Sequence, residues 1–540
     1  MDQCDVVIIG AGHNGLVCAA YLAAAGLDVR VVERRDIVGG AAVTEEFAPG
    51  FRNSTASYTV SLLAPQVIAE LDLAGHGLRI VERRVQNMLP LPDGRALIAA
   101  PGRTKDSVAQ FSAKDAQALD AFSAQLERVA DALRKEILRA PPNLVDGPFL
   151  RSAQEGWKAL GLAGRMRALP QDDRIALFEL FTKSAGDLLD GWFESDPVKA
   201  LFGFDSIVGH YESPYSPGSA YVLLHHAFGE VNGRKGFWGH AIGGMGAITQ
   251  AMARAALAKG AKISCGAGVR EVIVEKGRAA GVVLETGARI AARRVVSSVN
   301  PNLLFTKLTP QEALPPAFLR RMKAWRSGSG TFRMNVALSR LPDFTAMPGA
   351  GDHLTSGIII APSLAYMERA YFDAKLHGWS RKPVVEMLIP STLDDSLAPP
   401  GLHVASLFCQ HVAPVLPDGA SWDDRREEVA DLMIATLEDY APGFSASVIA
   451  RQIHSPLDLE RKFGLVGGDI FHGALTLDQL FSARPALGYA DYRAPLAGLY
   501  MCGSGAHPGG GVTGAPGRNA AQAILADARA TRHKAPGSQQ

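Results

Sequence analysis

A glycine pattern near the N-terminus has the residue types and spacing of a dinucleotide site. Gly10, Gly12 and Gly15 form G-x-G-x-x-G between an apolar run at 6–9 and an Ala-rich segment at 16–25. The first glycine permits a tight turn, the second lets a pyrophosphate touch the backbone, and the third lets helix and strand pack closely. The N-terminus of the helix offers free N–H groups and partial positive charge to phosphates. The segment therefore predicts dinucleotide binding.

The residues that follow extend this prediction. Glu33 closes a predicted strand at 29–32, where its carboxylate can accept hydrogen bonds from the adenosine ribose hydroxyls. Arg34 is a further candidate contact, although Glu33 would repel a 2′-phosphate beside it. Gly39, Gly40 and Ala41 form a second place where the backbone can approach a dinucleotide.

A second glycine-rich run lies near the other end of the chain, at 503–517 (GSGAHPGGGVTGAPG). A predicted strand at 499–502 precedes it and a predicted helix from 518 follows it, so we interpret the run as a binding loop and not as a linker. The positive end of that helix would stabilise the negative charge that builds on a flavin during reduction. A single dinucleotide that is held by both 10–40 and 503–518 would be bound tightly along its length. This describes FAD better than NAD, which exchanges with solution.

The middle of the chain adds a third piece of the same fold. Gly244 and Met245 begin an amphipathic helix that ends at Gly260, and short alternating strands follow up to Val296. This pattern predicts a β-meander that returns to the main sheet.

The predicted fold class is α/β with an α+β insert: a split Rossmann-type FAD-binding domain that carries an inserted substrate domain of mixed sheet and helices. The FAD-binding domain takes 1–75, 236–300 and 491–530. A mainly helical substrate or lid region takes 76–235, a substrate domain of sheet and helices takes 301–490, and 531–540 form a flexible tail. Strands are expected at 332–338, 358–360, 384–389 and 402–409.

Bulk composition excludes several classes. The 540 residues carry 55 basic and 54 acidic side chains, so the net charge of +1 gives no field for nucleic acid. No apolar run is long enough to span a membrane, and the five scattered cysteines contain no C-x-x-C pair. We expect a cytoplasmic protein of bacterial type without a redox-active dithiol. The segment 149–169 could place it at the inner membrane surface, although packing against the protein itself is the favoured interpretation.

These motifs together resemble the phytoene desaturase-like FAD-dependent oxidoreductases, and within them the subgroup named for a pyridine nucleotide-disulfide oxidoreductase domain. The resemblance rests on VVIIGAGHNGL, the GGAA doublet, GGMGAITQAMARAA and CGSGAHPGGGVTGAPGRNAA. It implies noncovalent FAD and dehydrogenation, isomerisation or saturation of long isoprenoid-like molecules. It also implies adenine contact through the backbone of Val269 and isoalloxazine contact at the C-terminal loop by Gly503, Gly510 and Val512, and Gly511 in the same loop is a further candidate cofactor residue. Ala41 departs from the arginine found in wider flavin amine oxidase relatives.

Three functions stay open from the sequence. The first is an FAD-dependent oxidoreductase that moves a hydride between flavin N5 and a long isoprenoid- or carotenoid-like substrate, with a quinone or oxygen as acceptor. The second is a flavin amine oxidase. Such an enzyme would usually show an aromatic cage and an acid after the C-terminal glycine strand, and this sequence has SGAHPGGG there, without either. The third is a flavoprotein that acts mainly as a partner-binding or assembly factor.

Candidate catalytic residues lie near the predicted flavin loops: His507, His240 and Trp238. We interpret His225 and His226, on an apolar run, as core histidines. No metal site is predicted, because adjacent histidine rings diverge on either a helix or a strand. The substrate, the acceptor and the oligomeric state are not determined by the sequence.

Overall fold

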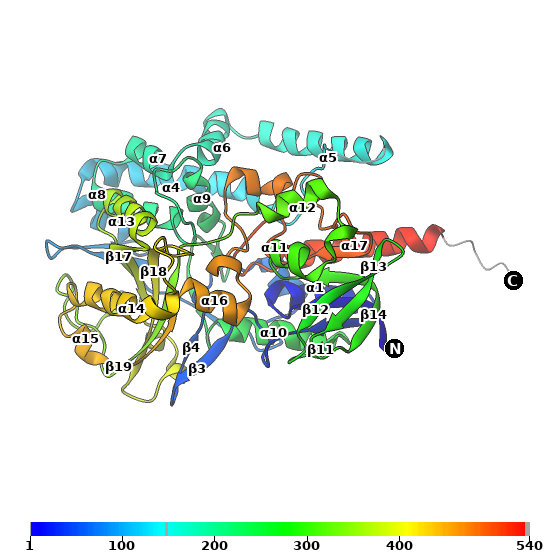
Figure 1. The fold of residues 1–540 in the computed structure, drawn as a ribbon. Helices are drawn as coiled ribbons and strands as arrows, with labels where there is room; N and C mark the ends of the chain where they lie inside the picture. Colours follow the sequence, from blue (N-terminus) through cyan, green and yellow to red (C-terminus); the bar gives the residue numbers. More distant parts are fainter. Residues whose placement is uncertain (1, 146–148, 535–540) are drawn as a thin grey trace.

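The computed structural model describes residues 2–145 and 149–534, and two seven-stranded sheets form its framework. Figure 1 shows the two sheets side by side, with the helices from α4 (Ala113–Arg134) to α9 (Ser219–Ala227) gathered along one side of the molecule. This is the mixed α/β architecture that the sequence predicted.

The first sheet carries the nucleotide fold. Its strands are β1 (Asp2–Ile9), β2 (Val29–Val32), β11 (Lys262–Ser264), β12 (Val269–Glu275), β13 (Arg278–Leu284), β14 (Arg289–Ser297) and β20 (Leu499–Met501). β1 pairs in parallel with β2 on one side and β14 on the other, and β20 pairs in parallel with β14. Val6, Val7 and Ile8 have no exposed surface, which explains their continuously apolar run. Three segments far apart in sequence therefore meet in one sheet.

Three helices contact one another beside this sheet: α1 (His13–Ala24), α10 (Met245–Ala258) and α17 (Ala515–Lys534), with α1 touching both of the others. Ala19 and Ala20 are fully buried on α1, and their small side chains let the helices approach closely. Because α17 continues to Lys534, the tail predicted from 531 is helical in its first residues. Residues 535–540 lie outside the described part of the chain.

The fold brings two cysteines together that are far apart in sequence. Cys18 on α1 contacts Cys502, which directly follows β20, and both are completely buried. Both are free thiols, and burial raises the pKa of Cys18 well above its usual range. A buried, protonated thiol is unreactive, so this contact is a packing feature.

The second sheet contains β6 (Asn87–Pro90), β7 (Ala96–Ala99), β15 (Phe332–Leu338), β16 (Gly357–Ile360), β17 (Trp379–Leu388), β18 (His403–Val412) and β19 (Val448–His454), in the order β19-β15-β18-β17-β16-β6-β7. Four of these strands lie where the sequence predicted them. The hairpin of β6 and β7 comes instead from the stretch that was expected to be mainly helical. A Pro-Asp-Gly turn between two apolar runs could have predicted this hairpin from the sequence.

The remaining major helices are α2 (Pro65–Glu70), α3 (Thr104–Ala109), α5 (Phe149–Arg167), α6 (Gln171–Thr182), α7 (Ala185–Trp192), α8 (Asp196–Gly203), α12 (Pro316–Lys323), α13 (Leu364–His377), α14 (Trp422–Glu438) and α16 (Pro456–Phe463). Ser112 is the N-cap of α4, because its Oγ accepts a hydrogen bond from the Asp115 N–H at 3.0 Å. Over the described ranges 2–145 and 149–534, no helix is both long and apolar enough to cross a bilayer.

Candidate active site

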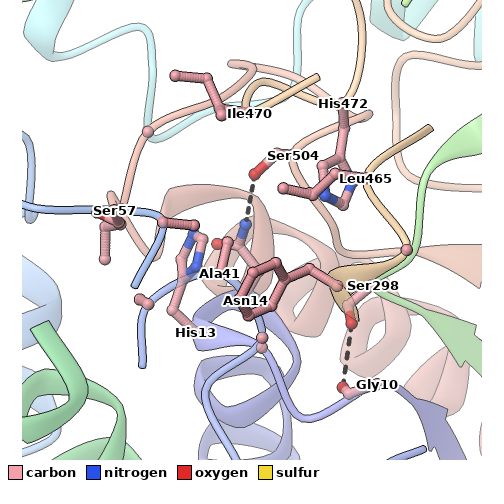
Figure 2. A pocket seen from close by; sticks show the side chains of 18 of the residues that line it. Gly10, His13, Asn14, Ala41, Ser57, Ser298, Leu465, Ile470, His472 and Ser504 are labelled. Carbon is pink, nitrogen blue, oxygen red and sulfur yellow. Dashed lines mark hydrogen bonds between the residues drawn. The ribbon is translucent and has the colours of Figure 1, made fainter. Parts of the chain in front are cut away.

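One cavity, called the main cavity below, collects most of the residues that the sequence assigned to cofactor binding. It begins at the glycine turn after β1 and extends toward residues 56–63 and 463–472. The predicted cofactor residues that line it are Gly10, Gly12, Glu33, Arg34, Gly40, Ala41, Met245, Val269, Gly511 and Val512. Figure 2 shows side chains from the N-terminal turn, from residues 465–472 and from Ser504 surrounding the same space.

The glycine turn has the geometry expected for a pyrophosphate. Gly10 has a φ of +91°, which favours glycine, and its N–H donates to the Val32 carbonyl at 2.8 Å. A Cβ on Gly15 would lie 2.2 Å from the Gly10 carbonyl oxygen, so only glycine allows this packing. A Cβ on Gly12 would instead meet no described atom within 4 Å. Gly12 therefore faces space that a bound cofactor can fill.

Glu33 is held in place at the cavity wall by two backbone hydrogen bonds. Its two carboxylate oxygens accept hydrogen bonds from the Ala11 N–H at 2.8 Å and from the Arg35 N–H at 3.0 Å. Its side chain is buried at the cavity wall, where its remaining lone pairs can accept ribose hydroxyls. Arg34 donates to the carbonyls of Arg461 and Lys462 at 3.1 and 3.0 Å. Arg34 thus ties the adenosine end of the cavity to α16.

Several buried polar atoms at the cavity wall have no partner in the described part of the chain. They include His13 Nε2, Asn14 Oδ1, Ser61 Oγ and His472 Nδ1. Asn14 Nδ2 donates to Ser504 Oγ at 3.2 Å, and Ser298 Oγ donates to the Gly10 carbonyl at 3.0 Å, as Figure 2 shows. Unpaired buried polar atoms are costly, so this wall fits a polar ligand such as the ribityl and phosphate parts of FAD.

Two of the histidines that line the main cavity, His13 and His472, are neutral in the protein. Burial lowers the pKa of His13 to about 4, although a hydrogen bond with the Gly511 backbone raises it. Burial, together with the His13 ring and the charge of Arg484, lowers the pKa of His472 to about 3. At neutral pH both rings therefore act as hydrogen-bonding groups and not as cations.

Five predicted cofactor residues support the cavity from behind its surface: Gly15, Gly39, Gly244, Gly503 and Gly510. A Cβ on Gly503 would lie 2.3 Å from the Ser298 carbonyl oxygen, and one on Gly510 would lie 2.1 Å from Phe471 Cδ1. These glycines allow close packing of protein on protein. A direct contact with isoalloxazine, which the resemblance implied for Gly503 and Gly510, stays a prediction.

The far end of the main cavity has an apolar and aromatic wall that includes Tyr58, Val60, Trp238 and Ile470. The Trp238 ring stacks on His226 at 6.1 Å with an interplanar angle of 24°. Trp238, a predicted catalytic residue, therefore forms part of a flat surface in this cavity. Stacked rings of this kind hold a planar ligand by shape.

Charged groups lie directly behind this wall. The Arg333 guanidinium is 4.5 Å from the Tyr58 ring, and the Arg83 guanidinium is 5.7 Å from the Trp238 ring. Glu386 accepts a hydrogen bond from the Tyr58 hydroxyl at 2.5 Å. Burial and the charge of Glu386 raise the pKa of Asp205 to about 8, which leaves it uncharged at neutral pH. Two guanidinium groups thus lie close to the Glu386 carboxyl group, where burial raises the pKa of Glu386 and both cations oppose that rise.

His240, the second predicted catalytic residue, lies away from the main cavity surface. Its Nε2 is 3.0 Å from Asp394 Oδ2, and both side chains are buried. The same carboxylate accepts the Gly243 N–H at 2.6 Å and the Ser396 N–H at 3.1 Å. Burial raises the pKa of Asp394, but these hydrogen bonds outweigh it and hold the pKa well below its usual range. This arrangement positions the loop that leads into α10.

We expect Asp394→Asn to destabilise the protein by about 2 kcal/mol at neutral pH, because it removes a charged acceptor from several hydrogen bonds. A lowered pKa in the folded state means that the stabilisation is present above the unfolded pKa of about 4 and is lost as the pH falls through the folded value. The difference in melting temperature between the wild type and Asp394→Asn should therefore shrink below about pH 4. Exposed Asp395→Asn serves as the control, and equal melting curves for all three proteins would contradict this role.

His507, the third predicted catalytic residue, faces a different cavity. Its Nε2 donates to the Glu136 carbonyl at 3.3 Å, and its side chain lines the space between α5 and α17. Gly509 and Gly511, with φ of +122° and +94°, turn the loop so that Gly511 and His507 face opposite sides. The structure therefore separates His507 from Trp238 and the main cavity.

Sequence reasoning missed several residues of the site. His226 was interpreted as a core histidine but lines the main cavity, and Tyr58 was not singled out. Arg484 was also missed: it is fully buried and donates to the carbonyls of Ser504, Phe471 and Gln479 at 2.8, 2.7 and 3.0 Å. The only local signal for it was a charged residue within an apolar stretch.

Comparisons with known proteins agree with this geometry. Residues 15–332 match the family described as flavin containing amine oxidoreductase. The chain is 43% identical to pyridine nucleotide-disulfide oxidoreductase domain-containing protein 2 of Rattus norvegicus, over 97% of this chain and 93% of that protein. It is 28% identical to one of the limonene dehydrogenase subunits of Castellaniella defragrans, over 98% of this chain and 95% of the other. Its fold resembles that of a solved putrescine oxidase variant, with a TM-score of 0.61, 17% identity, and 98% and 99% of the two chains covered.

Proposed function

Because the chain belongs to the flavin containing amine oxidoreductase family and is an FAD-dependent oxidoreductase, we propose that its substrate is a long, uncharged isoprenoid-like molecule. The bound flavin accepts or returns a hydride at N5. Transfer requires the reacting C–H bond to be held close to the flavin, in a cavity from which water is excluded.

The observation that carries this proposal is the chemistry of the cavity wall. Among the described residues, the acids that line the main cavity are Glu33 and Glu285, and Glu33 is committed to the adenosine end. The opposite end is apolar and aromatic, and Arg83 and Arg333 stand behind it. An ammonium substrate would meet no acid that lines this end, and behind the wall the Glu386 carboxylate is already paired with the Tyr58 hydroxyl and lies close to the Arg83 and Arg333 cations, which is unfavourable. An uncharged hydrocarbon chain meets no such cost.

Specific side chains take defined parts in this function. The stacked Trp238 and His226 rings would hold an unsaturated chain flat, and Tyr58 would border it. The limonene dehydrogenase relative is named for an isoprenoid hydrocarbon, which favours the same substrate class. Desaturation of such a molecule would need an electron acceptor, saturation would need an electron donor, and isomerisation would need neither.

The test is an anaerobic titration of the FAD-loaded protein with candidate substrates, followed by the flavin absorbance band at about 450 nm. We expect geranylgeraniol in detergent to bleach this band and putrescine to leave it unchanged. Bleaching by putrescine alone would favour an amine oxidase and contradict the proposal. A band that no apolar, amine or alcohol substrate bleaches would also contradict it, and would favour a flavoprotein that acts as a partner-binding or assembly factor.

A further inference from the structure

A second cavity lies on the other side of the glycine loop 503–512, between α5 and α17, and is called the α5–α17 cavity below. It has a volume of about 1660 Å³, and no described residue lines both it and the main cavity. Its walls include Leu162 and Met166 of α5, Leu177 and Phe178 of α6, and Ala523 of α17. The cavity is therefore separate from the main cavity, and its wall combines an apolar part with charged residues, which are Glu136, Arg139, Glu155, Lys158, Arg165, Arg174, Asp491, Arg493 and Asp527.

Its inner end combines aromatic rings with unused hydrogen-bonding capacity. The His507 ring lies 5.6 Å from the Phe481 ring, which lies 5.3 Å from the Phe181 ring. His507 is 1% exposed, and its Nδ1 has no partner in the described part of the chain. The Tyr492 hydroxyl accepts a hydrogen bond from Asn519 at 2.8 Å, so its own hydrogen can be donated to a ligand. This end offers one donor and one acceptor beside a flat apolar surface.

Packed rings form the wall between the two cavities. The ring of Tyr221 lies 6.0 Å from Phe481 and 6.4 Å from His225, and His225 lies 5.7 Å from Phe471 at the main cavity surface. A molecule in the α5–α17 cavity cannot reach the flavin closely enough for hydride transfer, which needs near contact. Electrons, in contrast, can cross a layer of packed side chains without such contact.

We propose that the α5–α17 cavity binds the electron acceptor and that this acceptor is a lipophilic quinone. The planar ring would lie against Phe481 and Phe181, one carbonyl would accept from the Tyr492 hydroxyl, and the apolar tail would follow Leu162 and Met166 toward the solvent. This inference rests on the proposed function only for the source of the electrons.

The reaction balances without a further oxidant. The reduced flavin is oxidised by two electrons and releases its protons to solvent. The quinone takes up two electrons and two protons and becomes a hydroquinone. His507 Nδ1 can accept the new hydroxyl hydrogen bond, and the cavity mouth supplies protons from water.

The test uses two tryptophan substitutions on the same helix. Leu162→Trp would fill the α5–α17 cavity, whereas Leu160→Trp lies on the opposite, exposed face of α5, where Leu160 is 65% exposed. Calorimetric titration of the FAD-loaded protein with decylubiquinone should show binding that Leu162→Trp weakens at least about tenfold and Leu160→Trp leaves unchanged. Met166→Trp is the second cavity-filling variant, for use if Leu162→Trp does not fold.

A second readout is flavin reoxidation after chemical reduction with dithionite, which requires no substrate. Leu162→Trp should slow reoxidation by decylubiquinone at least about tenfold and leave reoxidation by dioxygen unchanged. Equal quinone binding by the two tryptophan variants would overturn the proposal. So would competition by geranylgeraniol for the quinone site, because the cavity would then be a substrate entrance. Neither result depends on whether geranylgeraniol bleaches the flavin.

Discussion

Replacing Gly12 with valine should give a folded protein that does not retain FAD. The Gly12 backbone has φ −68° and ψ 168°, an extended conformation that valine adopts without strain. A Cβ there would meet no described atom within 4 Å, so the fold leaves space for the start of a side chain. The valine would instead occupy the space where the pyrophosphate approaches the helix N-terminus.

The measurement is the ratio of flavin to protein absorbance after purification and after reconstitution with excess FAD. We expect the FAD content to fall at least about tenfold, which corresponds to about 1.4 kcal/mol of lost binding at subsaturating FAD. Gly191→Ala is the matched control, because a Cβ there also meets nothing within 4 Å but lies on α7, outside the main cavity. The melting temperature of the apoprotein should be the same for wild type and Gly12→Val. Full flavin content in Gly12→Val would mean that the cofactor does not approach this turn.

The nucleotide fold was predictable because its signals are local. Strand, glycine turn, helix, second strand and Glu33 follow one another within the first 33 residues, and each has a distinct pattern. The three-piece assembly was also predictable, since glycine-led helices recur at α10 and α17. Glycine patterns identify positions where another group must come close to the backbone. They do not say whether that neighbour is cofactor or protein, as Gly503 and Gly510 illustrate.

The apolar end of the main cavity could not be predicted, because no stretch of sequence contains it. Tyr58, His226, Trp238 and Ile470 come from four separate segments and meet only after both sheets have formed. His226 and the adjacent His225 look alike in sequence, yet only His226 lines the main cavity. The placement of His507 depends on two positive φ values in its loop, and composition alone does not encode them.

Arg484→Lys should destabilise the protein more than any exposed arginine substitution, because Arg484 connects the glycine loop 503–512 to the wall of the main cavity at Phe471. Its guanidinium is fully buried, and it donates to Ser504 in the loop and to Phe471 at the main cavity surface. Burial lowers the pKa of Arg484 to about 10, and the nearby Asp469 opposes that shift, so Arg484 stays charged at neutral pH. Lysine carries a single ammonium group and cannot span carbonyls that the planar guanidinium reaches together.

We expect a loss of about 3 kcal/mol in the free energy of unfolding for Arg484→Lys, and a larger loss for Arg484→Met, which leaves the buried carbonyls and Asp469 without their cation. Thermal denaturation followed by circular dichroism, with flavin fluorescence as a second probe, measures both effects. Flavin release should come at a lower temperature than global unfolding, because Ser504 lies in the cofactor loop. Arg84→Lys, at an exposed ion pair with Asp352, is the matched control and should melt like the wild type. If Arg484→Lys also melts like the wild type, the packing of its glycines alone holds the loop 503–512 in place. Arg484 would then not contribute to stability by joining this loop to Phe471.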